Sequence, residues 1–394
     1  MRVISKKGIL NFSLDVLSML SLFTATSCII LKSAHTKPIC TPEDFDVFAV
    51  KTIFSRGSAG LNIFKPLLNP KVAENSLSVP ETPKEESNIS PKNEDNKIEA
   101  EENSQIQNIQ LDNSGVKLPE IPEGEEDSHA EDEKKCRVIE KHISGGTKCE
   151  NFYVKNTTGQ DVDLNGYLKK EPAIEIKETS EPQVLIMHTH TSESYLQKDT
   201  GYFYENFYPR SLENGKNVTA VGEMITQVLK NHGINTIHST VYHDNPSYNG
   251  SYCRAAQTIK ETTEKYPSIQ MVIDIHRDSM GNKELGKVKP TFTYDGKKSS
   301  QLMIICGCDP DGSVGFPNWE KNLSLGLRLQ KYCETLFPGI TRPLNFSKVK
   351  YNEHLTPGSL LIEVGSDVNT LKESLHTGFM LGTSLSKMLN DLKK

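Results

Sequence analysis

Apolar residues recur at helical or strand-like spacing mainly in the C-terminal part of the chain. Residues 217–233 carry apolar side chains at helical spacing, which predicts a helix with Asn217 as its N-cap and Gly233 beyond its end. Strands that alternate with helices indicate an α/β fold with a central mixed or mostly parallel sheet flanked by helices. Further helices are predicted over 252–266, 322–337 and 368–392, and strands over 184–187, 234–242, 269–275, 302–306 and 360–362.

Residues 71–135 lack any such period. This stretch holds 18 Asp and Glu against 7 Lys and Arg, a net charge of −11, and it has no aromatic residue. The whole chain of 394 residues carries a net charge of −6, so its acidity belongs to this segment. An acidic balance also disfavours a nucleic-acid-binding protein, which normally has a basic face. A segment this charged and this poor in apolar residues cannot offset its ordering entropy by burial. We therefore expect an acidic, largely disordered linker over 71–149 and a folded domain over 150–394.

The first 35 residues have the pattern of a membrane segment. Three basic residues among the first seven precede a mostly apolar stretch over 16–31, which favours an N-in, C-out orientation. We expect a single-pass anchor over 1–35 and a juxtamembrane segment over 36–70, with everything that follows outside the cytoplasm. A cleaved signal or lipid anchor and a buried helix are the alternatives.

Polar clusters stand where three predicted strands end. The strand 184–187 runs into His188, His190 and Glu193, the strand 269–275 runs into His276, and the strand 360–362 runs into Glu363. Ligands of open α/β sheets bind at the carboxyl ends of the strands. We therefore expect these side chains to share one site.

The residue types suit a catalytic zinc ion, which is often held by two His and one Glu with a fourth position left for water. We assign His190, Glu193 and His276 as the ligands of Zn²⁺ and Glu363 as the general base that accepts a proton from the attacking water. His188 is the alternative first ligand, because alternation along an extended chain places it on the same face as His190. Otherwise we expect His188 to support the ligands or to contact substrate.

Other polar residues near the predicted strand ends and helix starts are candidates for substrate binding. An arginine binds a carboxylate through its bidentate fork, and a structural ion pair is the alternative. These candidates are Asn217, Asp244, Arg254 and Arg277.

The cysteine and serine residues do not form the motifs of other common sites. No CxxC pair occurs among the eight cysteines, which disfavours a zinc ribbon. Cys306 and Cys308 lie in an apolar run and are interpreted as buried core thiols, while a disulfide between Cys136 and Cys149 stays open. The sequence around Ser192 and Ser194 has no GxSxG elbow, which disfavours a serine hydrolase.

Residues 183–195 read QVLIMHTHTSESY, residues 243–248 and 251–254 read HDNPSY and SYCR, and residues 272–278 read VIDIHRD. These four strings resemble the stage II sporulation protein P family, over a region of about residues 151–390. The resemblance implies a single zinc-amidase-like domain that acts on peptidoglycan as an N-acetylmuramoyl-L-alanine amidase, with an endopeptidase activity also ascribed to the family. His276 is similar to the second His of the wider zinc amidase group, and Glu363-Val-Gly365 is similar to its catalytic Glu-x-Gly motif. Glu193 follows the first His more closely than in that group.

The same resemblance implies a place and partners. It implies a role with stage II sporulation proteins D and M in thinning septal peptidoglycan during engulfment. The catalytic domain would then stand in the space between the mother-cell and forespore membranes, held to the cell membrane by its N-terminal segment. Two other functions stay open: a zinc endopeptidase or carboxypeptidase acting on stem peptides, and a non-catalytic scaffold of the septum.

Overall fold

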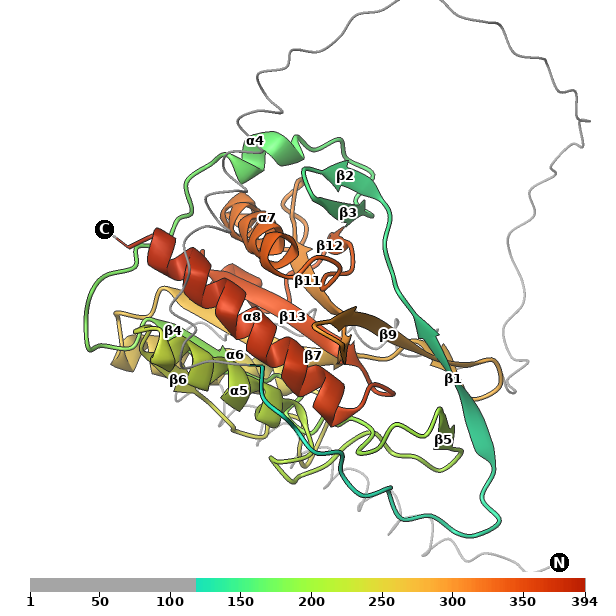
Figure 1. Cartoon of the computed structure of the whole chain (residues 1–394). Coiled ribbons are helices and arrows are strands. Elements are labelled where there is room, and N and C mark those ends of the chain that lie inside the picture. Colours follow the sequence, from blue (N-terminus) through green and yellow to red (C-terminus); the bar gives the residue numbers. More distant parts are fainter. Residues whose placement is uncertain (1–117, 394) are drawn as a thin grey trace, which may run out of the picture. The chain divides into compact units, whose positions relative to one another are not determined.

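The computed structural model describes residues 118–393, and its core is an eight-stranded sheet (Figure 1). The expected mixed, mostly parallel sheet is confirmed, since five of its seven strand pairs are parallel. In spatial order the strands are β2 (Thr147–Cys149), β3 (Phe152–Asn156), β12 (Leu344–Ser347), β11 (Leu302–Gly307), β13 (Ser359–Ser366), β7 (Met271–Asp278), β4 (Val184–Met187) and β6 (Thr236–His238).

The strand directions bring the predicted clusters to one edge of this sheet. Strands β6, β4, β7 and β13 run parallel to one another, so their carboxyl ends share an edge. Strand β11 is antiparallel to β13, and β12 is parallel to β11, so the residues just before β12 lie at that same edge. In the register between β13 and β7, Glu363 lies opposite His276.

Four long helices cover the sheet: α5 (Val218–Asn231), α6 (Ser251–Lys265), α7 (Trp319–Leu336) and α8 (Leu371–Asp391). Figure 1 shows α8 in front of the strands, between α7 and α5. These three helices share the main apolar core, whereas Ala255 and Ile259 of α6 pack on a second cluster with Leu185 and Val272. The sheet is therefore buried on both faces, which explains why its strands are continuous apolar runs. A short helix, α4 (Leu164–Leu168), lies beside α7.

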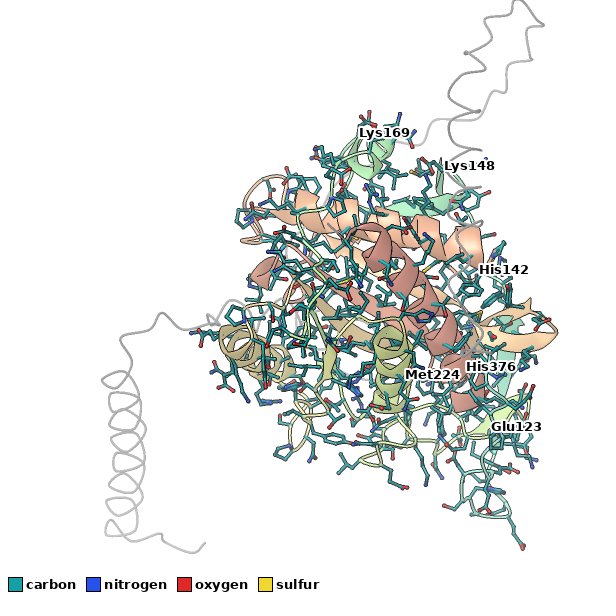
Figure 2. All side chains as sticks on the ribbon, turned by 60° about the vertical axis from the view of Figure 1, so that its left-hand side comes forward. Glu123, His142, Lys148, Lys169, Met224 and His376 are labelled. Carbon is teal, nitrogen blue, oxygen red and sulfur yellow. The ribbon has the colours of Figure 1, made fainter. Side chains whose placement is uncertain are left out.

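Helix α5 begins as the sequence predicts. The Asn217 side chain accepts a hydrogen bond from the backbone N–H of Thr219, and Gly233 follows the last turn with a φ of 75°. Figure 2 shows Met224 of α5 and His376 of α8, two helices that pack closely because Gly378 of α8 lies against Val221 and Met224.

A second sheet was not expected from the sequence. It joins β10 (Lys297–Ser300), β9 (Gly286–Tyr294), β1 (Lys135–Lys141) and β5 (Tyr202–Tyr204), with β8 (Gly281–Asn282) paired to β9. Strands β1 and β2 precede the expected domain boundary at residue 150, so the fold begins inside the segment 71–149 that was interpreted as a linker. Strand β1 buries only Cys136 fully among its seven residues, and its apolar pattern is correspondingly weak.

The expected membrane segment 1–35, the juxtamembrane segment 36–70 and most of the linker lie outside the described residues. Within residues 118–393 no helix has the length and apolar character that a membrane crossing requires.

The cysteines of the core are thiols. Cys306 and Cys308 are buried, which confirms their interpretation, and burial raises the pKa of the Cys308 thiol to about 11. Cys136 and Cys149 are also thiols, so the disulfide considered between them does not form.

A test of core packing is available at Gly326 of α7, where an added Cβ would collide with Sγ of the buried Cys306. Alanine normally stabilises a helix interior by about 1 kcal/mol relative to glycine. Here Gly326→Ala should instead lower stability by about 1–3 kcal/mol, because overpacking outweighs helix propensity. Urea unfolding measures the change.

The matched control is Gly215→Ala, where an added Cβ meets no atom within 4 Å. In a double-mutant cycle, Cys306→Ala should recover most of the loss caused by Gly326→Ala. Additive effects of the two changes would contradict the packing account.

Candidate active site

The loop after β4 gives different surroundings to His190, the assigned first ligand, and to His188, its alternative. The strand ends at Met187, and the backbone N–H of Glu193 donates to the carbonyl of His190 at 3.0 Å, closing a turn. Because the chain turns here, the alternation that would place His188 and His190 on one face stops at Met187.

His188 has hydrogen-bonding partners at both ring nitrogens. Its Nδ1 lies 2.9 Å from the carbonyl oxygen of Ile275, which only accepts, so Nδ1 carries the proton. Its Nε2 lies 2.9 Å from Nε2 of His238, and Gly222 of α5 leaves the room that this pair needs. Burial lowers the pKa of His188 to about 3, so the ring is a neutral part of the core.

His190, Glu193 and His276 lie together at the end of the sheet. The rings of the two histidines are perpendicular, with centroids 5.3 Å apart, and Oε2 of Glu193 lies 3.5 Å from Nδ1 of His276. Nδ1 of His190 is buried and makes no hydrogen bond within the part of the chain that the structure describes. Burial opposes ionisation of Glu193, but Arg277 and His276 outweigh it and hold the pKa of this carboxyl well below its usual range.

Asp274, which sequence reasoning left out of the site, forms an ion pair with His276. Its Oδ1 lies 3.0 Å from Nε2 of His276, and its two oxygens accept from the backbone N–H and the hydroxyl of Thr189 at 2.7 and 2.6 Å. Burial lowers the pKa of His276, but the carboxylates of Asp274 and Glu193 outweigh it and raise this pKa well above its usual range. The signal was present in the sequence, since residues two apart on a strand share a face.

Glu363 stands on the neighbouring strand, beside His276. One of its oxygens, Oε2, is buried and makes no hydrogen bond to the residues described. Burial raises the pKa of Glu363 to about 8, and the charge of Asp278 adds to this. Arg342, just before β12, donates to Asp278 at 2.8 Å and completes this edge of the site.

The types of side chain at the site are those that bind zinc, but their arrangement is not that of a metal-coordination site. Two imidazoles and one carboxylate adjoin, and Nδ1 of His190 is a buried nitrogen without a partner among residues 118–393. Over that same range, no three His, Cys, Asp or Glu side chains form a group arranged to hold a metal ion. His276 is instead held between Asp274 and Glu193.

The two candidate arginines bind backbone carbonyls. Arg277 donates through Nε and Nη2 to the carbonyls of Ser194 and Pro209, at 3.1 and 2.6 Å. Arg254 donates through Nε to the carbonyl of His243 at 2.6 Å. Both guanidinium groups therefore hold loops in place.

Asn217 and Asp244 also hold the loop that carries Glu193. Asn217 is fully buried as the cap of α5. Asp244 accepts from the hydroxyl of Ser192 at 2.6 Å and from Nη1 of Arg210 at 2.7 Å. Arg210, which sequence reasoning missed, also reaches within 3.9 Å of Glu193.

Three tyrosines that were not predicted form a wall over the histidines. The ring of Tyr248 stacks on His190 with centroids 4.4 Å apart and planes 11° from parallel. Tyr252 lies nearly parallel to His276 at 6.4 Å, and Tyr351 packs on Tyr252 at 5.7 Å. Tyr252 lies in the first turn of α6, and Tyr248 lies in the loop before that helix, so helical spacing does not predict that the two rings share a face. No spacing pattern predicts Tyr351 either.

Comparisons with known proteins place the chain in a family. It is 30% identical over 223 residues to stage II sporulation protein P of Bacillus subtilis (strain 168), a match that covers 54% of this chain and 52% of that one. The chain thus spans about half the length of the curated relative it matches.

Two solved amidase structures are also similar. The amidase AmiC2 of Nostoc punctiforme shares 11% identity at a TM-score of 0.31, over 54% of this chain and 98% of that one. The CwlD amidase of Clostridioides difficile, solved with the GerS lipoprotein, shares 11% identity at a TM-score of 0.33, over 53% and 99%.

The family model of stage II sporulation protein P matches residues 50–386. Because this match spans most of the sequence, the chain belongs to the stage II sporulation protein P family.

Proposed function

We propose that the chain is a zinc-dependent peptidoglycan hydrolase of sporulation, an N-acetylmuramoyl-L-alanine amidase. The observation that carries the proposal is the convergence of His190, Glu193, His276 and Glu363 at the carboxyl ends of three parallel strands. Family membership supports the hydrolase role, and the donor types support zinc.

In this proposal His190, Glu193 and His276 hold the metal ion. Asp274 orients the ring of His276, while Arg277 and Arg210 keep Glu193 ionised. When bound, zinc lowers the pKa of a coordinated water to about 7 and polarises the scissile carbonyl.

Glu363 is the proton carrier. Its pKa is raised to about 8, which is close to neutral pH. A group whose pKa lies near the working pH can both accept and release a proton. A nearby cation favours the ionised form, so the carboxylate is ready to accept a proton from the attacking water. It then passes that proton to the leaving amine of the stem peptide. The tyrosine wall of Tyr248, Tyr252 and Tyr351 limits the access of other water.

We further propose the setting implied by the family resemblance. Residues 1–35 anchor the protein in the cell membrane, the acidic segment gives the domain reach, and the domain faces the space between the mother-cell and forespore membranes. Stage II sporulation proteins D and M are its proposed partners in thinning septal peptidoglycan.

The first prediction concerns the metal. After dialysis against zinc and then buffer, the full chain should retain about one equivalent of zinc by atomic absorption, as a single three-ligand site requires. His190→Ala and His276→Ala should lose it. His188→Ala should keep it but unfold at a lower temperature, because both nitrogens of His188 serve the core. His142→Ala, at an exposed position, is the control. Equal zinc loss in His188→Ala and His190→Ala would overturn the assignment of the first ligand.

The second prediction separates catalysis from structure. Glu363→Gln should bind zinc normally and lose about 10²–10⁴-fold in kcat on purified peptidoglycan, the usual contribution of a general base. Mass spectrometry of the products should show glycan strands stripped of whole stem peptides. Cleavage within the stems would identify an endopeptidase instead, and full complementation of sporulation by Glu363→Gln would indicate a scaffold.

The third prediction is a pH dependence of stability in the presence of chelator. The folded chain keeps a proton on Glu363 up to about pH 8, whereas the unfolded chain releases it near pH 4.3. The unfolded state therefore binds fewer protons between these values, and stability contributed by this group falls as the pH rises. Glu363→Gln should remove that part of the slope and raise the Tm at pH 8 by a few degrees, at about 2–4 °C per kcal/mol.

The control for this experiment is Glu284→Gln, at an exposed position. It should leave the dependence of Tm on pH between 5 and 8 unchanged. A Glu363→Gln protein whose Tm follows the same pH curve as the parent would show that this carboxyl ionises normally in the fold.

A further inference from the structure

Two cavities flank the segment 207–211, next to the proposed zinc ligands. Each has a volume of about 290 Å³. The first lies against β5 and also reaches Ser194 and Tyr195, which directly follow Glu193 in the chain, while the second contains Asp244 and Tyr248. Tyr208, Arg210 and Ser211 line both cavities, so this segment forms the ridge between them.

The ridge has a fixed backbone. The N–H of Ser194 donates to the carbonyl of Pro209 at 3.1 Å, and the N–H of Ser211 donates to the carbonyl of Ser192 at 2.7 Å. Nη2 of the buried Arg277 holds the Pro209 carbonyl from the other side at 2.6 Å. These bonds tie the ridge to the residues on either side of Glu193, so a ligand held on the ridge is held in register with the site.

The side chain of Tyr208 is open to solvent although its backbone is fixed. It is 73% exposed, compared with 41% for Tyr248 across the second cavity. A rigidly presented, exposed aromatic ring beside a cavity is typical of a recognition surface, because it offers a large apolar area at little entropic cost.

The lining of the first cavity indicates the chemistry of the ligand. Six aromatic side chains contribute to it, and Leu196 is the single aliphatic residue among the lining residues that the structure describes. The other groups are carboxylates, amides, hydroxyls, ammonium groups and the guanidinium of Arg210, and they include Glu126, Gln197 and Lys216. Sugar rings present flat C–H faces and hydroxyl edges, which match aromatic faces and hydrogen-bonding groups, whereas apolar peptide side chains would favour aliphatic pockets.

We propose that Tyr208 is the stacking platform for a saccharide ring of the glycan strand, which lies along the two cavities across the ridge. The inference rests on the proposed function, since the bond cleaved by an amidase hangs from a muramic acid residue. It adds the part of the molecule that positions that sugar. Arg210, 22% exposed in its side chain and already paired with Asp244, supports the ridge beside the ring.

The test measures binding separately from cleavage. Glu363→Gln protein of the full chain, whose turnover should be lowered about 10²–10⁴-fold, is titrated with denuded glycan strands of alternating N-acetylglucosamine and N-acetylmuramic acid, and separately with free stem peptides. Adding Tyr208→Ala should weaken glycan binding about 5- to 100-fold, which lies within the effect of losing one aromatic stacking contact. Tyr208→Trp should retain binding, and peptide binding should change less than twofold. Tyr153→Ala, on the exposed side of β3, is the matched tyrosine control.

A second measurement uses the cleaving protein. Tyr208→Ala alone should raise KM for peptidoglycan about 5- to 100-fold with a kcat within twofold of the parent, because the ring positions sugar and touches no reacting atom. Unchanged glycan affinity in Tyr208→Ala would overturn the proposal, and so would a loss confined to stem peptides. Failure of the parent to release stem peptides would instead overturn the amidase, while the glycan titration still decides the role of Tyr208.

Discussion

The charge balance around Glu193 is the constraint on which the site depends. This carboxylate is buried, and a buried carboxylate without compensation costs several kcal/mol. Three positively charged or protonatable groups surround it: His276 at 3.5 Å, and Arg210 and Arg277 at 3.9 Å each. The same Arg277 binds the carbonyls of Ser194 and Pro209. The same group of side chains therefore balances the charge of Glu193 and holds the loops of the site in place.

His276 shows how the sheet itself prepares a place for a cation. The pleat of β7 puts Asp274 and His276 on one face, and the turn after β4 brings Glu193 to the other side of the ring. Two carboxylates around one imidazole favour a positive charge between them, which raises the pKa of His276. The backbone register therefore favours a positively charged group at this position.

The sequence predicted those elements in which a regular spacing of apolar residues continues over many positions. Helices α5, α6, α7 and α8 and strand β4 lie where the apolar spacing placed them, and the three strand ends meet as expected. The roles of single polar residues were harder to predict. Arg254 and Arg277 stand near strand ends as expected, yet their guanidinium groups bind backbone carbonyls, and no spacing rule reveals a hydrogen-bond partner. His190 as the first zinc ligand stays a prediction, and what separates it from His188 is a turn that alternation could not foresee.

The fold begins before the expected boundary at residue 150, for a related reason. Composition predicts a linker where apolar residues are too few to cover the cost of order. Near its end, however, this acidic segment finds polar partners: Glu126 accepts from the hydroxyls of Tyr202 and Tyr204 at 2.9 and 3.0 Å, and the ring of His129 stacks on Tyr204. Strand β1 then pairs with β5 and β9. Because Glu126 also lines the first cavity, the end of the acidic segment is part of the wall beside the site. Hydrogen bonds to tyrosine hydroxyls therefore help to order a charged sequence here. A hydropathy pattern does not reveal such hydrogen bonds.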